Sequence, residues 1–176
     1  EDPETAGLRL AACAQILNTG GFRLGLSEAA VDELYQEGLQ LAERLGDLAA
    51  TSGVRGAYNV RLVGLGRIRE YVKRLRKDNP DTAIVFMATT RAPSRKAKWP
   101  ELDKFNTGLA AYCKEESNVW FVDINPALNQ PSGEGKEGHY LKDNLHPSEL
   151  GYQEIAKVLK PAVDAAWKAT EKAFKK

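Results

Sequence analysis

The stretch VWFVDI at residues 119–124 is a short apolar run that carries an acid near its end. A Gly-rich polar segment follows at 129–140, and DNLHPSELGY at 143–152 then leads into a helix that we expect to begin at Ser148. A continuous apolar run bounded by turn signals is typical of a strand buried on both faces of a parallel sheet. This order of strand, loop and helix predicts the last part of an α/β domain.

A second apolar run, AIVFMA at 83–88, predicts another strand buried on both faces. Helical spacing of apolar residues predicts helices around it, at about 28–45, from about 65 to Asp78-Asn79-Pro80, and from about Pro100. The helix from Ser148 is expected to kink or restart at Pro161, and we expect it to bury Leu150, Ile155, Val158 and Leu159. Alternation of helices and strands predicts adjacent parallel strands joined by right-handed crossovers.

The first third of the chain is harder to interpret. Periodicity leaves residues 8–17 open between a short strand and a helix. Residues 49–66 are Gly-rich and give no clear element. A short strand at 10–17 that lies in the sheet would indicate a shortened first half of the family's domain, and a helix packed outside the sheet would indicate an unrelated helical replacement.

Composition sets broad limits on the protein. Its 176 residues suffice for one domain with a core, and a net charge of +1 gives no general attraction to nucleic acid. No apolar run reaches the roughly 18 residues that a membrane span needs. Cys13 and Cys113 are too few and too far apart to indicate a metal site, and two reduced thiols are the simplest interpretation. The sequence begins at Glu1 with no initiator Met and no signal peptide, which suggests a processed or truncated N-terminus. The sequence does not indicate the cellular compartment.

The candidate catalytic and ligand-binding residues lie at the expected carboxyl ends of the strands. In parallel α/β sheets ligands bind at this edge, and Asp143, three residues before His146, falls there. A buried carboxylate can orient an imidazole and stabilise its protonated form while the ring takes a hydroxyl proton. The same two residues could instead cap the last helix as a hydrogen-bonded pair. Arg91 and Arg95 follow the first strand, and they could hold an anion or form a solvated loop.

From about Leu65 to Val163 the chain resembles the second half of the SGNH (GDSL-type) esterases and lipases. The similarity includes IVFMATTRAPSR, a helix carrying Asn106, FVDI and above all the closing run Asp-x-x-His, Pro and Gly-Tyr at 143–152. It implies a three-layer α/β/α sandwich with a parallel sheet, SGNH hydrolase-like or flavodoxin-like, with an atypical or truncated N-terminal third. It also implies that His146 is a general base and that Asp143 orients it.

The other catalytic parts of that family are missing from the sequence. None of the six serines lies in a Gly-Asp-Ser motif, and no Gly-x-Asn-Asp is present. Ser27, in Gly-Leu-Ser before a helix, is a weak nucleophile candidate that we interpret first as a helix cap. Gly21 and Asn59 are weak candidates for the oxyanion hole. A serine upstream of residue 1 is the remaining source of a nucleophile.

Two functions compete on these grounds. The first is a degenerate SGNH-like protein without a serine nucleophile, which serves as a binding or structural subunit among other protein subunits. The second is an active serine esterase acting on small esters such as acetylated sugars. We favour the first because two of four catalytic parts are absent. Neither function needs a metal or cofactor.

We expect one domain over residues 1–176. It comprises a degenerate or replaced N-terminal part (1–64), a family-like part (65–163) and a basic C-terminal helix or tail (164–176).

Overall fold

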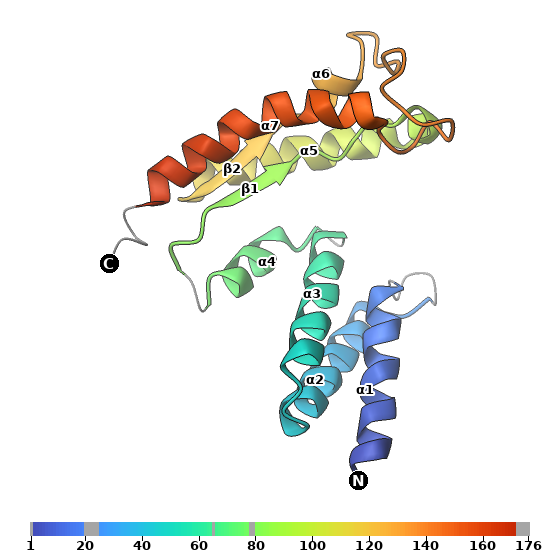
Figure 1. Ribbon diagram of the computed structural model, residues 1–176, viewed down its shortest axis with the longest axis vertical. Coiled ribbons are helices and arrows are strands. Elements are labelled where there is room, and N and C mark those ends of the chain that lie inside the picture. Colours follow the sequence, from blue (N-terminus) through green and yellow to red (C-terminus); the bar gives the residue numbers. More distant parts are fainter. Residues whose placement is uncertain (1, 20–24, 65, 78–79, 172–176) are drawn as a thin grey trace. The chain divides into compact units, whose positions relative to one another are not determined.

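The computed structural model describes residues 2–19, 25–64, 66–77 and 80–171. Contacts divide the chain into two compact units, Glu1–Lys73 and Arg74–Lys176. The elements in chain order are α1 (Pro3–Asn18), α2 (Glu28–Arg44), α3 (Leu48–Gly64), α4 (Ile68–Leu75), β1 (Ile84–Met87), the 3-10 helix η2 (Pro93–Lys98), α5 (Trp99–Glu115), β2 (Val119–Val122), α6 (Asn125–Leu128) and α7 (Glu149–Thr170) (Figure 1).

The first unit is helical throughout the part that the structure describes. Helices α1, α2 and α3 pack on one another around a common apolar core. The open question over residues 8–17 is thus answered by a helix, which begins behind an Asp2 cap. Whether the N-terminal third is a shortened or a replaced first half of the domain stays a prediction.

Helix α3 was missed from the sequence because its glycines obscured a helical pattern. Its buried side chains include Thr51, Val54, Tyr58 and Leu62, which recur every three or four residues. Gly53 and Gly56 lie between them and have no heavy atom within 4 Å of an added Cβ. Glycine weakens a helix by roughly 0.5–1 kcal/mol relative to alanine, and burial of the apolar face outweighs that loss.

A cluster of polar side chains around Asp32 joins α2, α3 and the start of α4. The Tyr58 hydroxyl donates to Asp32 at 2.6 Å, and Arg67 Nη1 lies 3.1 and 3.2 Å from the two carboxylate oxygens of Asp32. Arg67 also donates to Glu70. Burial of the Tyr58 ring, its hydrogen bond to Asp32 and the nearby negative charge raise the pKa of that phenol well above its usual value. Through these bonds Arg67 and the first turn of α4 are held to Asp32 of α2.

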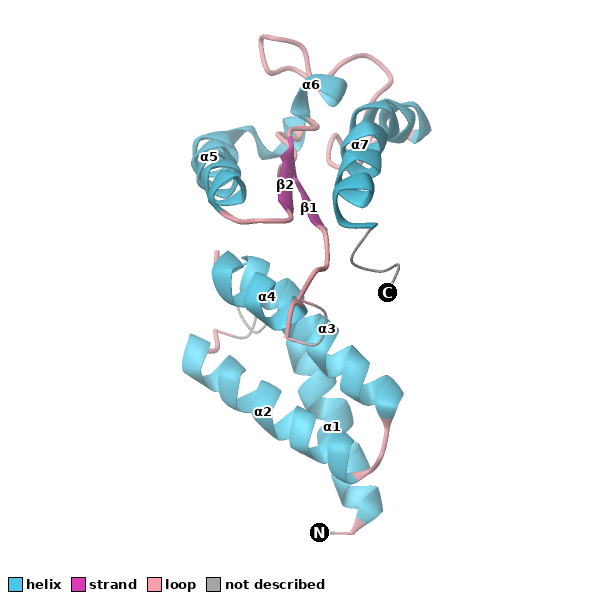
Figure 2. Ribbon diagram, turned by 90° about the vertical axis from the view of Figure 1, so that its left-hand side faces the viewer, coloured by secondary structure: helices cyan, strands magenta, loops and turns pink. Residues whose placement is uncertain are grey.

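The second unit has the predicted α/β arrangement. Strands β1 and β2 pair in parallel, with Ile84 opposite Val119 and Met87 opposite Val122. Helix α5 lies on one side of the two strands and α7 on the other (Figure 2). These contacts make three layers, α/β/α, and confirm the predicted fold class and the predicted strand neighbours.

Several details of the second unit differ from the expectations. Strand β1 is not buried on both faces: its last residue, Met87, is 48% exposed, because β1 pairs only with β2 among the described residues. On α7, Leu150 and Val158 are 41% and 40% exposed, whereas Ile155 is buried. Pro161 lies inside one uninterrupted helix of 22 residues and does not restart it. No helix in the described part of the chain has the length and apolar character to cross a membrane.

Candidate active site

The carboxylate of Asp143 is held by three hydrogen bonds within its own turn. Its Oδ1 accepts from the backbone N–H groups of Leu145 at 2.9 Å and of His146 at 3.1 Å. Its Oδ2 lies 2.6 Å from Nδ1 of the His146 ring. The spacing of three residues is what allows one carboxylate to bond both the backbone and the ring of the same histidine. The predicted pair is therefore formed within this turn.

The pairing defines the protonation of the two groups. The hydrogen bond from His146, followed by the two backbone N–H bonds, lowers the pKa of Asp143 to about 2. Because an ionised carboxylate can only accept, the proton between the two groups belongs to Nδ1. In a neutral ring the lone pair is then on Nε2, the atom that would act as a base.

The pair is more open than the sequence led us to expect. The side chains of His146 and Asp143 are 62% and 47% exposed, so the expectation of a buried carboxylate is wrong. Asp143 stays ionised because of hydrogen bonds rather than a buried charge partner. The ring is accessible to a reactant from solvent.

The turn is fixed from both sides by the neighbouring chain. Tyr140 and Pro147 form an antiparallel bridge, and the backbone N–H of Leu141 donates to the carbonyl of His146 at 2.8 Å. Ser148 caps α7, as predicted, by accepting from the N–H of Gly151 at 3.1 Å. The Ser148 hydroxyl also donates to the carbonyl of Gly138. The cap thus joins the histidine turn to the start of α7.

Gly151 explains why a glycine follows the histidine in this motif. A Cβ at this position would lie 2.3 Å from the carbonyl oxygen of His139 and 3.1 Å from the Cβ of Pro147. The same carbonyl accepts from the N–H of Ser148 at 2.9 Å, so it cannot move away without losing that bond. Only glycine lets the first turn of α7 approach the loop this closely.

The loop after β1 is bonded to the histidine turn. Asn144 has a positive φ of 53°, a conformation that Asn tolerates better than most residues. Its carbonyl accepts from the backbone N–H of Ser94 at 3.0 Å. Two segments about fifty residues apart in sequence are thereby joined at the edge where the sequence placed an active site.

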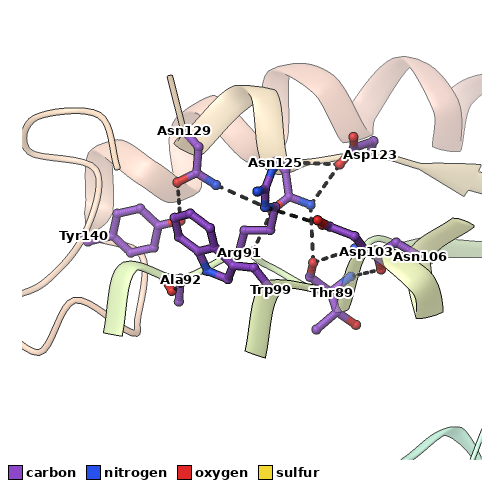
Figure 3. A network of polar contacts seen from close by, with 10 residues as sticks. All are labelled: Thr89, Arg91, Ala92, Trp99, Asp103, Asn106, Asp123, Asn125, Asn129 and Tyr140. Atoms are coloured by element: carbon purple, nitrogen blue, oxygen red, sulfur yellow. Dashed lines mark hydrogen bonds and ion pairs between the residues drawn. The ribbon is translucent and has the colours of Figure 1, made fainter. Parts of the chain in front are cut away.

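An amide network organises the same edge on the side of α5. Asn106 of α5 bonds both backbone groups of Thr89, at 2.8 and 2.9 Å. Asn125 accepts from the N–H of Arg91 at 2.7 Å, and its Nδ2 donates to Asp123 at 2.9 Å (Figure 3). Asn125 was not identified from the sequence, although its position directly after a predicted strand was a usable signal.

A cleft of about 1150 Å³ opens beside this network. Its walls come from α5, β2, α6 and the loop that follows α6, and Arg91, Asp103 and Asn125 line it. Neither Asp143 nor His146 is among its lining residues. The second unit therefore carries two distinct features, the exposed pair and the cleft.

The other predicted site residues are not brought together with the pair by anything the structure describes. Ser27 caps α2, as predicted, by accepting from the N–H of Ala30 at 3.2 Å. Asn59 lies inside α3, and Gly21 lies outside the described residues. Ser27 and Asn59 belong to the first unit.

The two cysteines and the acidic and histidine side chains are the other groups that could react or bind a metal. Cys13 and Cys113 are buried and carry free thiols in the structure, and burial raises the pKa of each thiol. Within the described ranges no group of three or more His, Cys, Asp and Glu side chains is arranged to hold a metal ion.

Parallel strands between two helical layers, with an Asp–His pair after the second strand, define a hydrolase-like α/β domain of the SGNH type. The family model of the GDSL-like lipase/acylhydrolase family matches residues 28–154, and the chain belongs to this family. The resemblance seen in the closing motif is thus confirmed.

A solved structure of a protein from Streptococcus pneumonia, provisionally named a platelet activating factor, is similar to the chain at 27% identity. The similarity covers 59% of this chain and 50% of that one, with a TM-score of 0.45. The chain thus matches half the length of that protein. No curated protein matches the chain.

Proposed function

We propose that this GDSL-type domain has kept the acid–base half of an ester-hydrolase site and has lost the serine nucleophile. It then serves as a binding or structural subunit of a larger protein assembly. The observation that supports the retained half is the 2.6 Å contact between Asp143 Oδ2 and His146 Nδ1 on an accessible ring. Support for the lost half is the absence of Gly-Asp-Ser and Gly-x-Asn-Asp from the sequence.

The chemistry of the retained half is well defined. Nε2 of a neutral His146 can accept a proton, and the Asp143 carboxylate stabilises the positive ring that results. Positioned general bases contribute about 10²–10⁴-fold in rate, but only when a nucleophile lies within hydrogen-bond reach. Loss of an oxyanion donor removes a further factor of about 10²–10³. A domain with the pair alone would not form an acyl-enzyme.

The serines of the second unit support this proposal by their bonding. The Ser148 hydroxyl is committed to the cap of α7 and to the carbonyl of Gly138. The Ser132 hydroxyl accepts from the N–H of Glu134 at 3.4 Å. Ser117 precedes β2 and so lies at the amino end of the strand, opposite the edge that carries the pair. Ser94 remains the one serine on the loop after β1, and it is exposed.

A second candidate function is favoured by the intact geometry of the pair. In it the protein is an active serine esterase on small acyl esters, with Ser27 or a serine outside these 176 residues as nucleophile. A catalytic pair whose carboxylate is held by three hydrogen bonds is what such an enzyme needs.

Labelling with a fluorophosphonate, together with a p-nitrophenyl acetate assay, separates the two functions. Under the first, the 176-residue chain takes no label and hydrolyses the ester no faster than its His146→Ala variant. Under the second with Ser27 as nucleophile, that serine is labelled, peptide mass spectrometry locates it, and His146→Ala abolishes both signals. A nucleophile outside these 176 residues predicts the same two signals only when the assay is made on a longer chain that includes it.

Matched variants make the labelling result specific. His139→Ala changes the chain's other histidine, which is on the loop before the pair, and should leave either outcome unchanged. Ser27→Ala tests the nucleophile candidate from the sequence, and Ser94→Ala tests the exposed serine on the loop after β1. A labelled serine whose loss ends hydrolysis would refute the proposal of a lost nucleophile.

A further inference from the structure

Arg91 is a partly buried cation at the cleft of the second unit. It follows β1, lines the cleft beside α5, and its side chain is about one third exposed. Its guanidinium lies over the ring of Trp99, 4.7 Å from the centroid (Figure 3). Stacking on an aromatic face is a common way for proteins to hold an arginine at a binding site.

The support under this guanidinium is rigid. The backbone N–H of Arg91 donates to Asn125 at 2.7 Å. Trp99 is buried, and its indole N–H donates to the carbonyl of Ala92 at 3.0 Å. Gly133, with a φ of +90°, lies close to the Trp99 ring. A Cβ added at this position would lie 3.0 Å from Trp99 Cζ3 and 3.5 Å from Arg91 Nη2, so a larger residue would crowd both side chains. The guanidinium is thus held before any ligand arrives.

Lys96 and Arg91 both lie against the Trp99 ring and each is near a carboxylate, but only Lys96 donates a hydrogen bond to its carboxylate. Lys96 Nζ lies 5.5 Å from the ring centroid and 2.5 Å from Glu134 Oε1. Arg91 Nε lies 3.4 Å from Asp103 Oδ1, in a geometry that makes no hydrogen bond. Among the described residues this buried Nε has no hydrogen-bond partner at all. A charged group left so poorly paired in a native fold calls for an explanation.

We propose that Arg91 binds an anionic group, a carboxylate or a phosphate, of a ligand that occupies the cleft. Nη1 and Nη2 make no hydrogen bond to any described residue, and their fork matches two oxygens of such a group. Because the arginine is already fixed by Trp99 and Asn125, binding pays little side-chain entropy. Asp103, which touches the arginine from its Nε side, opposes an incoming anion.

This site is independent of the proposed ester chemistry. Asp143 and His146 do not line the cleft, and the inference rests on the contacts of Arg91 alone. A binding measurement therefore tests it whether or not the protein hydrolyses esters.

The test is an NMR titration of the full chain with inorganic phosphate and, separately, with acetate. Ionic strength is held constant with sodium chloride, and the indole N–H of Trp99 and the Nε–H of Arg91 are followed. We expect saturable shifts of both signals with at least one anion. A response to phosphate alone, to acetate alone or to both identifies which oxygen group the site takes.

Three variants sharpen the titration. Arg91→Gln should abolish saturation, whereas Arg95→Gln should leave it unchanged, because Arg95 is exposed and does not line the cleft. Asp103→Asn should tighten binding several-fold by removing the opposing carboxylate. If Arg91→Gln fails to fold, the change in affinity of Asp103→Asn still tests whether the anion binds beside Arg91.

The proposal is overturned if neither anion shifts the wild-type signals beyond the effect of sodium chloride. It is also overturned if folded Arg91→Gln binds as tightly as wild type, or if Asp103→Asn weakens binding.

Discussion

The two units of this chain are built from different kinds of contact. In Glu1–Lys73, helices that follow one another in sequence pack on each other, and helical spacing accounts for the buried residues. In Arg74–Lys176, β1 pairs with β2 some thirty-five residues later, and the loop after β1 bonds the histidine turn fifty residues on. The family model spans parts of both units, yet the Asp–His pair and the cleft lie in the second. Long-range hydrogen bonds between loops, more than helix packing, are what position chemical groups here.

The largest expected effect comes from the two cores. Leu62 in the first unit and Leu128 in the second are both fully buried, so each change to alanine should reduce the free energy of unfolding by about 2–5 kcal/mol. All three tryptophans lie in the second unit, so their fluorescence reports that unit, while far-UV circular dichroism reports the helices of both.

If the two units unfold separately, Leu128→Ala shifts the fluorescence transition in urea and Leu62→Ala leaves it in place. Both variants should shift circular dichroism. A fluorescence transition that moves equally in the two variants would instead show one cooperative domain over the whole chain, which is the organisation predicted from the sequence.

A smaller effect is expected from a glycine in each unit. In Gly151→Ala the new methyl meets the carbonyl of His139, and we expect a loss of about 1–3 kcal/mol of unfolding free energy. In Gly38→Ala it meets the Cβ of Cys13 at 3.2 Å, and the better helix propensity of alanine offsets most of the strain. Gly108→Ala is the control, because nothing lies within 4 Å and it should stabilise α5 by roughly 0.5–1 kcal/mol.

Urea unfolding followed by tryptophan fluorescence ranks Gly151→Ala against Gly108→Ala, since both lie in the second unit. Circular dichroism adds Gly38→Ala. Equal stability of the Gly151 and Gly108 variants would mean that the first turn of α7 can move away from the loop.

The two serine caps come next. Ser27 accepts one backbone hydrogen bond at the start of α2, whereas Ser148 accepts one and donates another. Cap removal by alanine costs about 0.5–2 kcal/mol, and we expect Ser148→Ala to be near the upper end and Ser27→Ala near the middle. Thermal unfolding by circular dichroism measures both. An equal loss in both variants would show that the bond from Ser148 to Gly138 adds nothing.

Much of the second unit could be predicted from local patterns. The apolar runs around Val85 and Phe121, the Ser148 cap and the Asp–x–x–His turn all depend on residues close in sequence. The burial of individual side chains was predicted less well. Met87 and Leu150 were expected to be buried because they are apolar, but both are exposed, since burial depends on neighbouring elements that a single segment does not reveal. The helix α3 was missed because its glycines disfavour a helix in a sequence-based prediction. Burial of side chains such as Leu62, which the sequence does not reveal, stabilises the helix nevertheless.

The site was predictable where it is local and not where it is long-range. Asp143 and His146 make their bonds within one turn, so spacing alone was sufficient to pair them. The place of Arg91 over Trp99 depends on a 3-10 helix between them and on Gly133, more than forty residues after Arg91. No sequence pattern links these three residues.

The smallest effect concerns the titration of Asp143. Its pKa of about 2 lies below the ordinary value of an aspartate carboxyl, mainly because of the hydrogen bond from His146. A lowered carboxyl pKa adds stability that is fully present above the unfolded value and is lost as pH falls from about 4 toward 2. The carboxylate is accessible to solvent, so the change in unfolding midpoint across this window should be slight. Carboxyl carbon shifts measured by NMR against pH give the pKa directly.

Removal of the ring should raise that pKa. In His146→Ala the largest of its causes is gone, while the backbone bonds from Leu145 and from position 146 can persist, so the Asp143 pKa should move up toward its ordinary value without reaching it. His139→Ala should leave it where it is. An unchanged Asp143 pKa in His146→Ala would mean that the turn, and not the imidazole, holds the carboxylate ionised, and the pair would then be a structural feature of the turn rather than the retained half of a catalytic site.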